Sequence, residues 1–345
     1  MLSWMFRRSG GRCYRVAAGH ASDRIVLDGP DFDCGDRNAG AHHSVVTFSD
    51  AVVWPVFSAA AQANVAIAST LYDDKQQDDV LSRMRDYPVV TIDGESVCAD
   101  FKWSQANHYH RLVDVHARLW SLRHPALSSR SIKLLHCHDW SADIKTLIKA
   151  IAPNVSFVKC SRWHRYRCET YHHLPFLGRS LLPWKRHAAS SIGYLPGAFI
   201  RFHQEKTPEL FPTGRTFSDR IYVSRADATK RRVLNEPELT KGLAELGFEK
   251  VECSKLTLGD QFAAMRSASL IVGAHGAAMA NVMAATKRPY YLEVWPTPRM
   301  APRYLAEAGK IGLIDYDSVA GEADDVNADF EAPVDAILGK VRARL

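Results

Sequence analysis

A histidine flanked by glycines follows a short apolar strand in the second half of the chain. The segment Leu270–Asn281 reads LIVGAHGAAMAN, with a helix expected over Ala277–Ala285. Gly273 and Gly276 let the backbone come close to a ligand, and the N–H groups at a helix start favour a phosphate. A dinucleotide-binding fingerprint needs glycine where this chain has His275, so the pattern disfavours NAD. We interpret the histidine as a hydrogen-bond donor to a diphosphate; the alternative is that it only packs against or caps the turn.

Positive charge follows a second strand, Ile221–Val223. Arg225 lies at the end of this strand, with three basic residues behind it: Lys230, Arg231 and Arg232. This charge could hold a leaving diphosphate, although a basic run is also typical of a solvated surface. Asn235, followed by Glu238, predicts a helix N-cap with a capping-box partner.

A carboxylate stands at the end of the next predicted strand, Tyr290–Val294. Glu293 is followed there by Trp295 and Pro296. A carboxylate at the carboxyl end of a neighbouring strand suits the ribose hydroxyls of a bound nucleotide. The alternative interpretation is an exposed glutamate at a sheet edge.

A histidine, an aspartate and an arginine follow one another at intervals of four residues in the first half of the chain. His110, Asp114 and Arg118 would stack on one face of a helix, next to Asn107. A carboxylate–imidazole pair of this kind can act as a general base. The alternative is a salt-bridged surface.

Three further groups of polar residues follow strands. His136 and His138 with Asp139 lack a third metal ligand at matching spacing, so helix capping is favoured for Asp139 and sugar stacking for Trp140. Two Asp-x-Asp pairs are best explained as turn residues: Asp31 with Asp33, and Asp315 with Asp317. No metal site is predicted.

Short β-rich runs that alternate with helical patterns position these residues and predict an α/β fold with parallel sheets. The strands expected in the first half are 25–27, 45–48, 52–57, 89–92, 132–135 and 155–159, with helices over 105–122 and 142–151. Those expected in the second half are 221–223, 250–253, 270–272, 290–294 and 311–314, with helices over 236–246, 258–266, 277–285 and 334–345. We expect domains at 1–202 and 220–345, a linker at 203–219, and a ligand cleft between the domains.

The composition is that of a globular protein, with 46% hydrophobic and 24% charged residues. A net charge of +6 is too small to predict nucleic-acid binding. Seven scattered cysteines without CxxC spacing favour a reduced, cytoplasmic protein. The segment Met1–Arg8 lacks the apolar run of a signal or membrane anchor. Its Trp, Phe and Arg residues are compatible with a peripheral contact at the inner face of a membrane, or with a frayed terminus.

The order of these motifs resembles glycosyltransferase family 61, which includes bacterial capsule-type transferases, plant xylan-decorating enzymes and animal O-GlcNAc transferases. The residues that carry the resemblance are Ser224-Arg225, Arg231 to Glu236, Gly247-Phe248, Gly273-x-His275-Gly276-Ala277, Asn281 and Leu292-Glu293. Ala278 stands where the family usually has glycine. The helix that bears His110, Asp114 and Arg118 resembles the family's aromatic/His-x3-Asp-x3-Arg helix, although Arg111 departs from the bulky residue usual there.

The resemblance implies two facing Rossmann-like domains of the GT-B type and an inverting, metal-independent glycosyltransferase. It implies a donor such as a UDP-sugar, bound as a substrate with no other cofactor, and a glycan or glycolipid acceptor, in surface polysaccharide synthesis. The donor-binding residues it implies are Ser224, Arg225, Arg231, Gly273, His275, Gly276, Ala277, Asn281 and Glu293. For the catalytic base we favour Asp114 or His110. The alternatives are an NAD-dependent oxidoreductase and a nucleotide-sugar binding protein without turnover.

Overall fold

The chain divides into two compact units, Met1–Ser190 and Ser191–Leu345. The computed structural model describes residues 21–33, 44–55, 59–62, 65–67, 86–100, 107–175, 177, 192–298 and 304–345. The proposed membrane-contacting segment Met1–Arg8, together with Cys13 and Cys34, lies outside these ranges. Within them, no helix is both long and apolar enough to cross a membrane.

The first unit is built on a mixed sheet, in which the described residues contribute eight strands in the order β4-β3-β2-β8-β5-β6-β7, with β1 paired to β2. The strands are β1 (Ala21–Val26), β2 (Ser44–Trp54), β3 (Ala59–Gln62), β4 (Val65–Ile67), β5 (Val89–Cys98), β6 (Ile132–His136), β7 (Val155–Lys159) and β8 (Arg165–His173). Strands β8, β5, β6 and β7 run parallel. The β2 strand pairs antiparallel with β8, so the expectation of a parallel sheet holds for only half of this unit.

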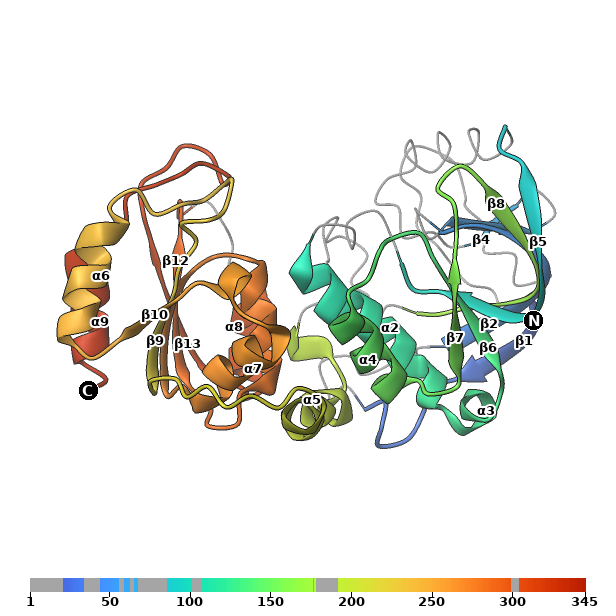
Figure 1. The fold of residues 1–345 in the computed structure, drawn as a ribbon, viewed down its shortest axis with the longest axis horizontal. Coiled ribbons are helices and arrows are strands. Elements are labelled where there is room, and N and C mark those ends of the chain that lie inside the picture. The colour runs from blue at the N-terminus through green and yellow to red at the C-terminus, as the bar shows by residue number, and fades with distance from the viewer. Residues whose placement is uncertain are drawn as a thin grey trace. The chain divides into compact units, whose positions relative to one another are not determined.

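Among the described residues of this unit, the helical elements follow β5 and β6 (Figure 1). They are the π-helix η4 (His110–Val115), α2 (His116–Trp120), the 3-10 turn η5 (Ser121–Arg123), α3 (Pro125–Ser128) and α4 (Ala142–Ile151). The buried side of α4 carries Ile144, Leu147, Ile148 and Ile151, at the spacing of one helix face. The sequence predicted the helix over 105–122 as a regular one, whereas its first part is a π-helix.

The second unit contains a parallel sheet of five described strands in the order β10-β9-β11-β12-β13. The strands are β9 (Arg220–Val223), β10 (Glu249–Val251), β11 (Leu270–Ala274), β12 (Tyr290–Trp295) and β13 (Asp315–Ala320). Numbered within the unit, this is the order 2-1-3-4-5 of a doubly wound α/β fold. Such sheets bind ligands beyond the carboxyl ends of the strands where the order reverses, here between β9 and β11.

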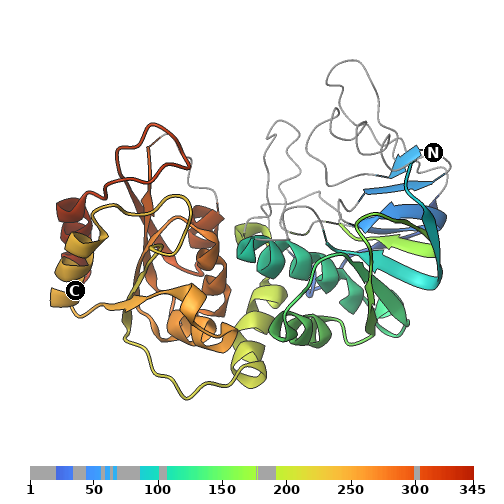
Figure 2. The same cartoon turned by 45° about the horizontal axis from the view of Figure 1, so that its top comes forward.

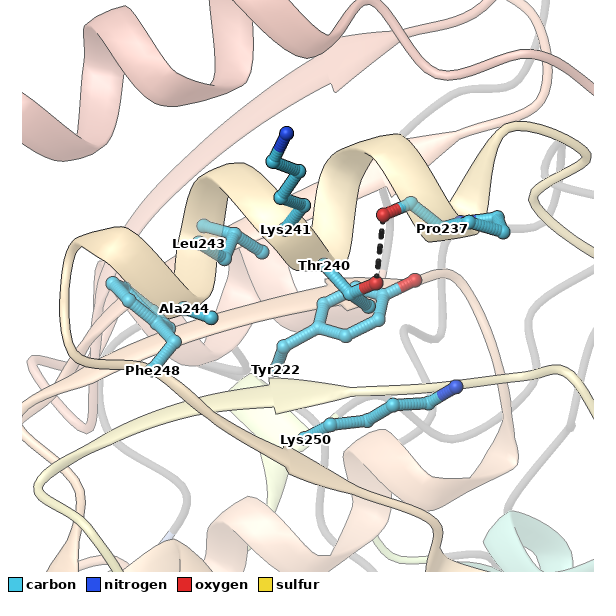
Figure 3. A pocket seen from close by; sticks show the side chains of 8 residues that line it. All are labelled: Tyr222, Pro237, Thr240, Lys241, Leu243, Ala244, Phe248 and Lys250. Atoms are coloured by element: carbon cyan, nitrogen blue, oxygen red, sulfur yellow. Dashed lines mark hydrogen bonds between the residues drawn. The ribbon is translucent and has the colours of Figure 1, made fainter.

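Helices cover both faces of this second sheet, as Figures 1 and 2 show. They are η6 (Ile192–Tyr194), α5 (Gly197–Leu210), α6 (Glu236–Glu245), η7 (Cys253–Lys255), α7 (Leu258–Ser267), the 3-10 helix η8 (Ala277–Ala284), α8 (Tyr304–Lys310) and α9 (Val334–Arg342). On one face, α6 and α9 pack together over the sheet in a cluster that includes Leu239, Leu243, Leu292 and Ile337. On the other, α7 packs against η8 and α5.

Three sequence expectations differ from the structure. The segment 203–219, expected to be a linker, is helical up to Leu210, because α5 buries Phe202, His203 and Thr207 on one side. The strand expected over 311–314 is wrong, since β13 begins only at Asp315. The β8 strand was missed because its buried residues alternate with Arg167, Glu169 and other polar ones instead of forming an apolar run.

Candidate functional site

The loops that follow β9 and β11 carry the residues singled out in the second unit. These two strands are neighbours, with Gly273 opposite Val223, so the residues that follow each strand come together. The sequence had separated these residues by about fifty positions, and the parallel pairing places them at the point where the strand order reverses.

Arg225 lies directly against Gly276, the residue that precedes η8. A Cβ atom at Gly276 would stand 1.8 Å from Nη1 of Arg225, so only glycine leaves room for the guanidinium here. Arg225 Nη2 donates to the carbonyl of Lys230 at 3.0 Å, and Nε is buried with no hydrogen-bond partner among the described residues. Burial and then the charge of Arg231 lower the pKa of Arg225. Two converging cations and an unsatisfied donor form a surface that an anion would stabilise.

The backbone of Arg231 adopts φ +59°, in the left-handed region. This conformation is uncommon for a residue with a side chain and costs about 1–3 kcal/mol, a cost typical of functional sites. The residues on its C-terminal side hold the loop in place. Arg232 donates to Asp329 through its backbone and its guanidinium. Asn235 exchanges two hydrogen bonds with the backbone of Ala332, so it does not cap α6 with its side chain as predicted.

Ser224 is part of a buried network around Glu236. Its hydroxyl donates to Glu236 Oε1 at 2.7 Å, and Tyr222 donates to the same oxygen at 2.9 Å. Lys250 donates to the other oxygen, Oε2, at 2.8 Å. The Ser224 hydroxyl also accepts from the backbone N–H of Ala226, in the turn that bears Arg225. These contacts make Ser224 a support for the arginine loop.

His275 is held by a carboxylate. Its Nδ1 atom lies 2.6 Å from Glu293 Oε1, and the ring stacks on Trp295 with centroids 4.3 Å apart. Glu293 is 1% exposed, and its other oxygen accepts from the hydroxyl of Tyr316 at 2.9 Å. The two predicted donor-binding residues therefore contact each other. Both oxygens of Glu293 contact protein groups, and the contact with ribose hydroxyls expected from the sequence stays a prediction.

The remaining predicted donor-binding residues lie within or around β11 and η8. Gly273 allows the close approach of the Tyr291 hydroxyl, which a Cβ would meet at 3.1 Å. Ala277 is the first residue of the expected helix, which is the 3-10 helix η8. Asn281 is fully buried and donates to Gln261 on α7 at 3.0 Å. Asn281 thus links η8 to α7.

In the first unit, the predicted His110–Asp114 pair is present. His110 Nδ1 lies 2.5 Å from Asp114 Oδ2, and Asp114 Oδ1 is buried without a hydrogen-bond partner among the described residues. Both residues belong to η4, and π-helical turns are rare and frequent at functional sites. Asn107 accepts hydrogen bonds from the backbone N–H groups of Tyr109 and His110, so it caps this helix.

Arg118, the third residue of the predicted stripe, lies in the core. It is fully buried, and its guanidinium donates to the carbonyls of Ala99 and Leu174, each at 3.2 Å. These two carbonyls directly follow β5 and β8, so Arg118 ties the helix to the ends of two strands. The spacing of four residues placed Arg118 in the predicted stripe, and these two contacts give its guanidinium a structural role.

A second histidine–carboxylate pair, which the sequence did not predict, lies at the ends of β5 and β6. His138 Nδ1 is 2.5 Å from Asp100 Oδ2, and Asp100 is fully buried. The backbone N–H groups of Cys137 and His138 donate to the same oxygen. The position of Asp100 at the end of a parallel strand was the available sequence signal.

The loop after β6 differs from expectation in two ways. Trp140 is 4% exposed and stacks on His136 with centroids 4.6 Å apart, so it is not an open sugar-stacking surface. Burial lowers the pKa of His136. Ser141, instead of Asp139, caps α4, and Asp139 forms an ion pair with Lys159.

The two Asp-x-Asp pairs have different environments. Asp31 lies in a turn, as predicted, closed by a hydrogen bond from Phe32 N to the Gly29 carbonyl. The turn prediction is wrong for the second pair, which lies in β13: Asp315 pairs with Arg344, and Asp317 with Lys340. In the described part of the chain, no three His, Cys, Asp or Glu side chains gather as ligands for a metal ion.

A doubly wound unit with cationic side chains at its switch point is typical of proteins that bind a nucleotide or another phosphate-bearing ligand. The model of the family described as Glycosyltransferase 61 matches residues 79–289, more than half of the chain. The chain therefore belongs to glycosyltransferase family 61. This membership indicates glycosyltransferase activity, with a sugar donor and a glycan acceptor. A search of curated proteins finds no match to this chain.

Proposed function

We propose that this chain is an inverting glycosyltransferase whose second unit holds the diphosphate of a nucleotide-sugar donor, UDP-linked in our preferred assignment. The contact between Arg225 and Gly276 carries the proposal. It places a half-buried guanidinium, with a buried, unsatisfied Nε and Arg231 nearby, against the backbone turn that precedes η8. An anion with several oxygens satisfies both the charge and the donors.

In the proposed reaction, an acceptor oxygen attacks the anomeric carbon of the donor sugar while the bond from that carbon to the diphosphate breaks. Inversion follows from a single displacement. The proton of the acceptor hydroxyl passes to a base, and the electron pair leaves with the nucleoside diphosphate. Arg225, Arg231 and His275 stabilise the charge that develops on the leaving group, in a site whose donors are already in place. We therefore expect turnover without an added divalent cation.

For the base we propose the His110–Asp114 pair. Asp114 is 99% buried and keeps one oxygen without a partner among the described residues. A carboxylate in contact with imidazole orients the ring and stabilises the imidazolium that forms when the ring accepts a proton. The acceptor we propose is a glycan or glycolipid of a surface polysaccharide.

Binding and turnover are tested separately. Calorimetry with UDP, with NAD as the comparison, should give binding to UDP that Arg225→Ala abolishes; absence of binding to any nucleoside diphosphate would contradict the donor site. A panel of nucleotide sugars with glycan acceptors, assayed with and without EDTA, then measures transfer. Donor binding without transfer or donor hydrolysis would favour a binding protein, and stabilisation by NAD alone an oxidoreductase.

The control for the base assignment is the second histidine–carboxylate pair, His138 and Asp100. Asp114→Asn should lower kcat by at least about a hundredfold with little change in UDP affinity, because the base acts on the acceptor. His138→Gln, which alters the Asp100 pair instead, serves as the matched variant. If Asp114→Asn and His110→Ala both leave turnover intact while His138→Gln removes it, the base is the Asp100–His138 pair.

A further inference from the structure

Four side chains, of which His275 is one, form a closed circuit of contacts. His275 Nδ1 contacts Glu293 Oε1, and Tyr316 donates to Glu293 Oε2. The indole Nε1 of Trp295 donates to the Tyr316 oxygen at 3.3 Å, and the same indole stacks on the His275 ring at an interplanar angle of 15°. Each member thus contacts two others, and the circuit returns to the histidine.

The strand register explains why these residues meet. Glu293 and Trp295 are two positions apart on β12 and therefore share a face of the sheet. Glu293 pairs in register with Ser318 on β13, and Tyr316 lies two positions before Ser318, on that same face. A Cβ at Gly309 of α8 would stand 2.8 Å from the Tyr316 Cβ, so the helix closes over the tyrosine.

The direction of each hydrogen bond follows from the protonation of Tyr316. Burial and then the charge of Glu293 raise the pKa of Tyr316 well above its ordinary value. The phenol therefore stays protonated and donates to Glu293, while its oxygen accepts from Trp295. Glu293 accepts on both oxygens, so the hydrogen between His275 and Glu293 resides on Nδ1. With Nδ1–H on Glu293, His275 donates to a diphosphate through Nε2–H, as an imidazolium that the Glu293 carboxylate stabilises.

We propose that Tyr316 and Trp295 are positioning residues for His275. They keep Nδ1–H on Glu293 and fix the ring orientation in which Nε2–H meets the diphosphate. Neither residue belongs to the segment matched by the family model, which ends at residue 289. This inference rests on the proposed function only for the identity of the ligand, since the circuit exists within the protein.

The decisive variant is Tyr316→Phe, which removes one hydroxyl and keeps the ring under α8. The matched control is Tyr290→Phe. Tyr290 also donates from β12 to a carboxylate on β13, reaching Asp317 Oδ2 at 2.9 Å, but it lies on the opposite face of β12 from Glu293 and Trp295. The two variants therefore lose the same kind of bond, and only Tyr316→Phe touches the support of His275.

The first readout needs no ligand. Ring ¹⁵N chemical shifts of His275, assigned with His275→Gln, should report the Nδ1–H tautomer in the wild type and in Tyr290→Phe. Tyr316→Phe should give a mixture of tautomers. If Tyr316→Phe leaves the His275 shifts as they are in Tyr290→Phe, the positioning role is overturned, whatever the protein binds.

The second readout is UDP affinity in a double-mutant cycle. Tyr316→Phe should weaken UDP binding by about tenfold, in the range for a charge-assisted hydrogen bond, and Trp295→Phe by less because it keeps a stacked ring. In the His275→Gln background, Tyr316→Phe should have no further effect. An equal loss in both backgrounds would refute action through His275. Failure of the wild type to bind UDP, with the tautomer result as expected, would instead refute the proposed donor and retain the positioning role.

Discussion

Gly276→Ala is the sharpest test of the arginine site, because the perturbation is a single methyl group placed at a known contact. Gly276 has φ −175° and ψ 174°, an extended conformation that alanine also adopts, so the backbone is not strained. The new Cβ would stand 1.8 Å from Arg225 Nη1 and 2.8 Å from Cζ. These atoms are the far end of a flexible side chain, so the arginine moves and the fold remains.

The size of the effect follows from how far the guanidinium must move. To reach an ordinary contact of 3.4 Å it must retreat by roughly 1.6 Å, which is more than a hydrogen bond tolerates. A hydrogen bond to a charged group contributes about 1.5–3 kcal/mol. We therefore expect UDP to bind roughly 10- to 150-fold more weakly. The free energy of unfolding should change by less than about 1 kcal/mol.

Isothermal titration calorimetry with UDP at fixed ionic strength measures the affinity, and urea denaturation measures the stability. Gly214→Ala is the control, since a Cβ at Gly214 meets nothing within 4 Å. In the Arg225→Ala background, Gly276→Ala should have little further effect, because the residue it displaces is gone. An affinity for UDP within twofold of the wild type in Gly276→Ala would refute the reasoning.

Three further predictions concern the support of this site and the stability of the unit. Glu236→Leu leaves Lys250 and two hydroxyls without their acceptor, and should lower the free energy of unfolding in urea by about 3–5 kcal/mol; no loss beyond about 1 kcal/mol would contradict the network. Asn235→Ala removes two hydrogen bonds to Ala332, which should cost about 2 kcal/mol in the same assay, and a neutral effect would show that this pairing contributes nothing. Burial lowers the pKa of His203 to about 3. Below the unfolded-state pKa of about 6.5, His203 is therefore protonated in the unfolded chain and neutral in the folded one. The free energy of unfolding then decreases as the pH is lowered, by up to about 1.4 kcal/mol per pH unit. His203→Leu, compared with the wild type at pH 7, 6 and 5, should have the shallower decline; identical slopes would show that His203 does not titrate this way.

The sequence predicted the second unit better than the first, for a physical reason. Parallel strands that are buried on both faces form apolar runs, and each run there is followed by a helix and a turn. Strand β8 instead places Tyr166, Cys168 and Tyr171 inside and charged residues outside, so it has no run to detect. The π-helix at His110 is equally hidden, because the same spacing of apolar residues is compatible with an α-helix.

Within the candidate site, the sequence predicted which loops bear the site residues. It did not distinguish residues that face the site from residues that support them. Arg225, Gly276 and His275 come together as the strand–turn–helix pattern implied. The sequence pattern could not predict the role of Tyr316, because the register between β12 and β13 brings it to Glu293. Asp100 was missed for a related reason, since its partner His138 follows a different strand.

Several residues of the family motif support the arginine site through contacts within the protein. A half-buried cation such as Arg225 loses part of its hydration, and it holds one position only if the surrounding backbone is rigid. Ser224 and Glu236 fix the turn before it, and Asn235 fixes the chain after it. The geometry of the site needs these supporting residues as much as it needs the arginine. A sequence motif therefore contains both the supporting residues and the arginine itself. Only substitutions that separate affinity from stability, as Gly276→Ala and Glu236→Leu do, can assign each residue to its role.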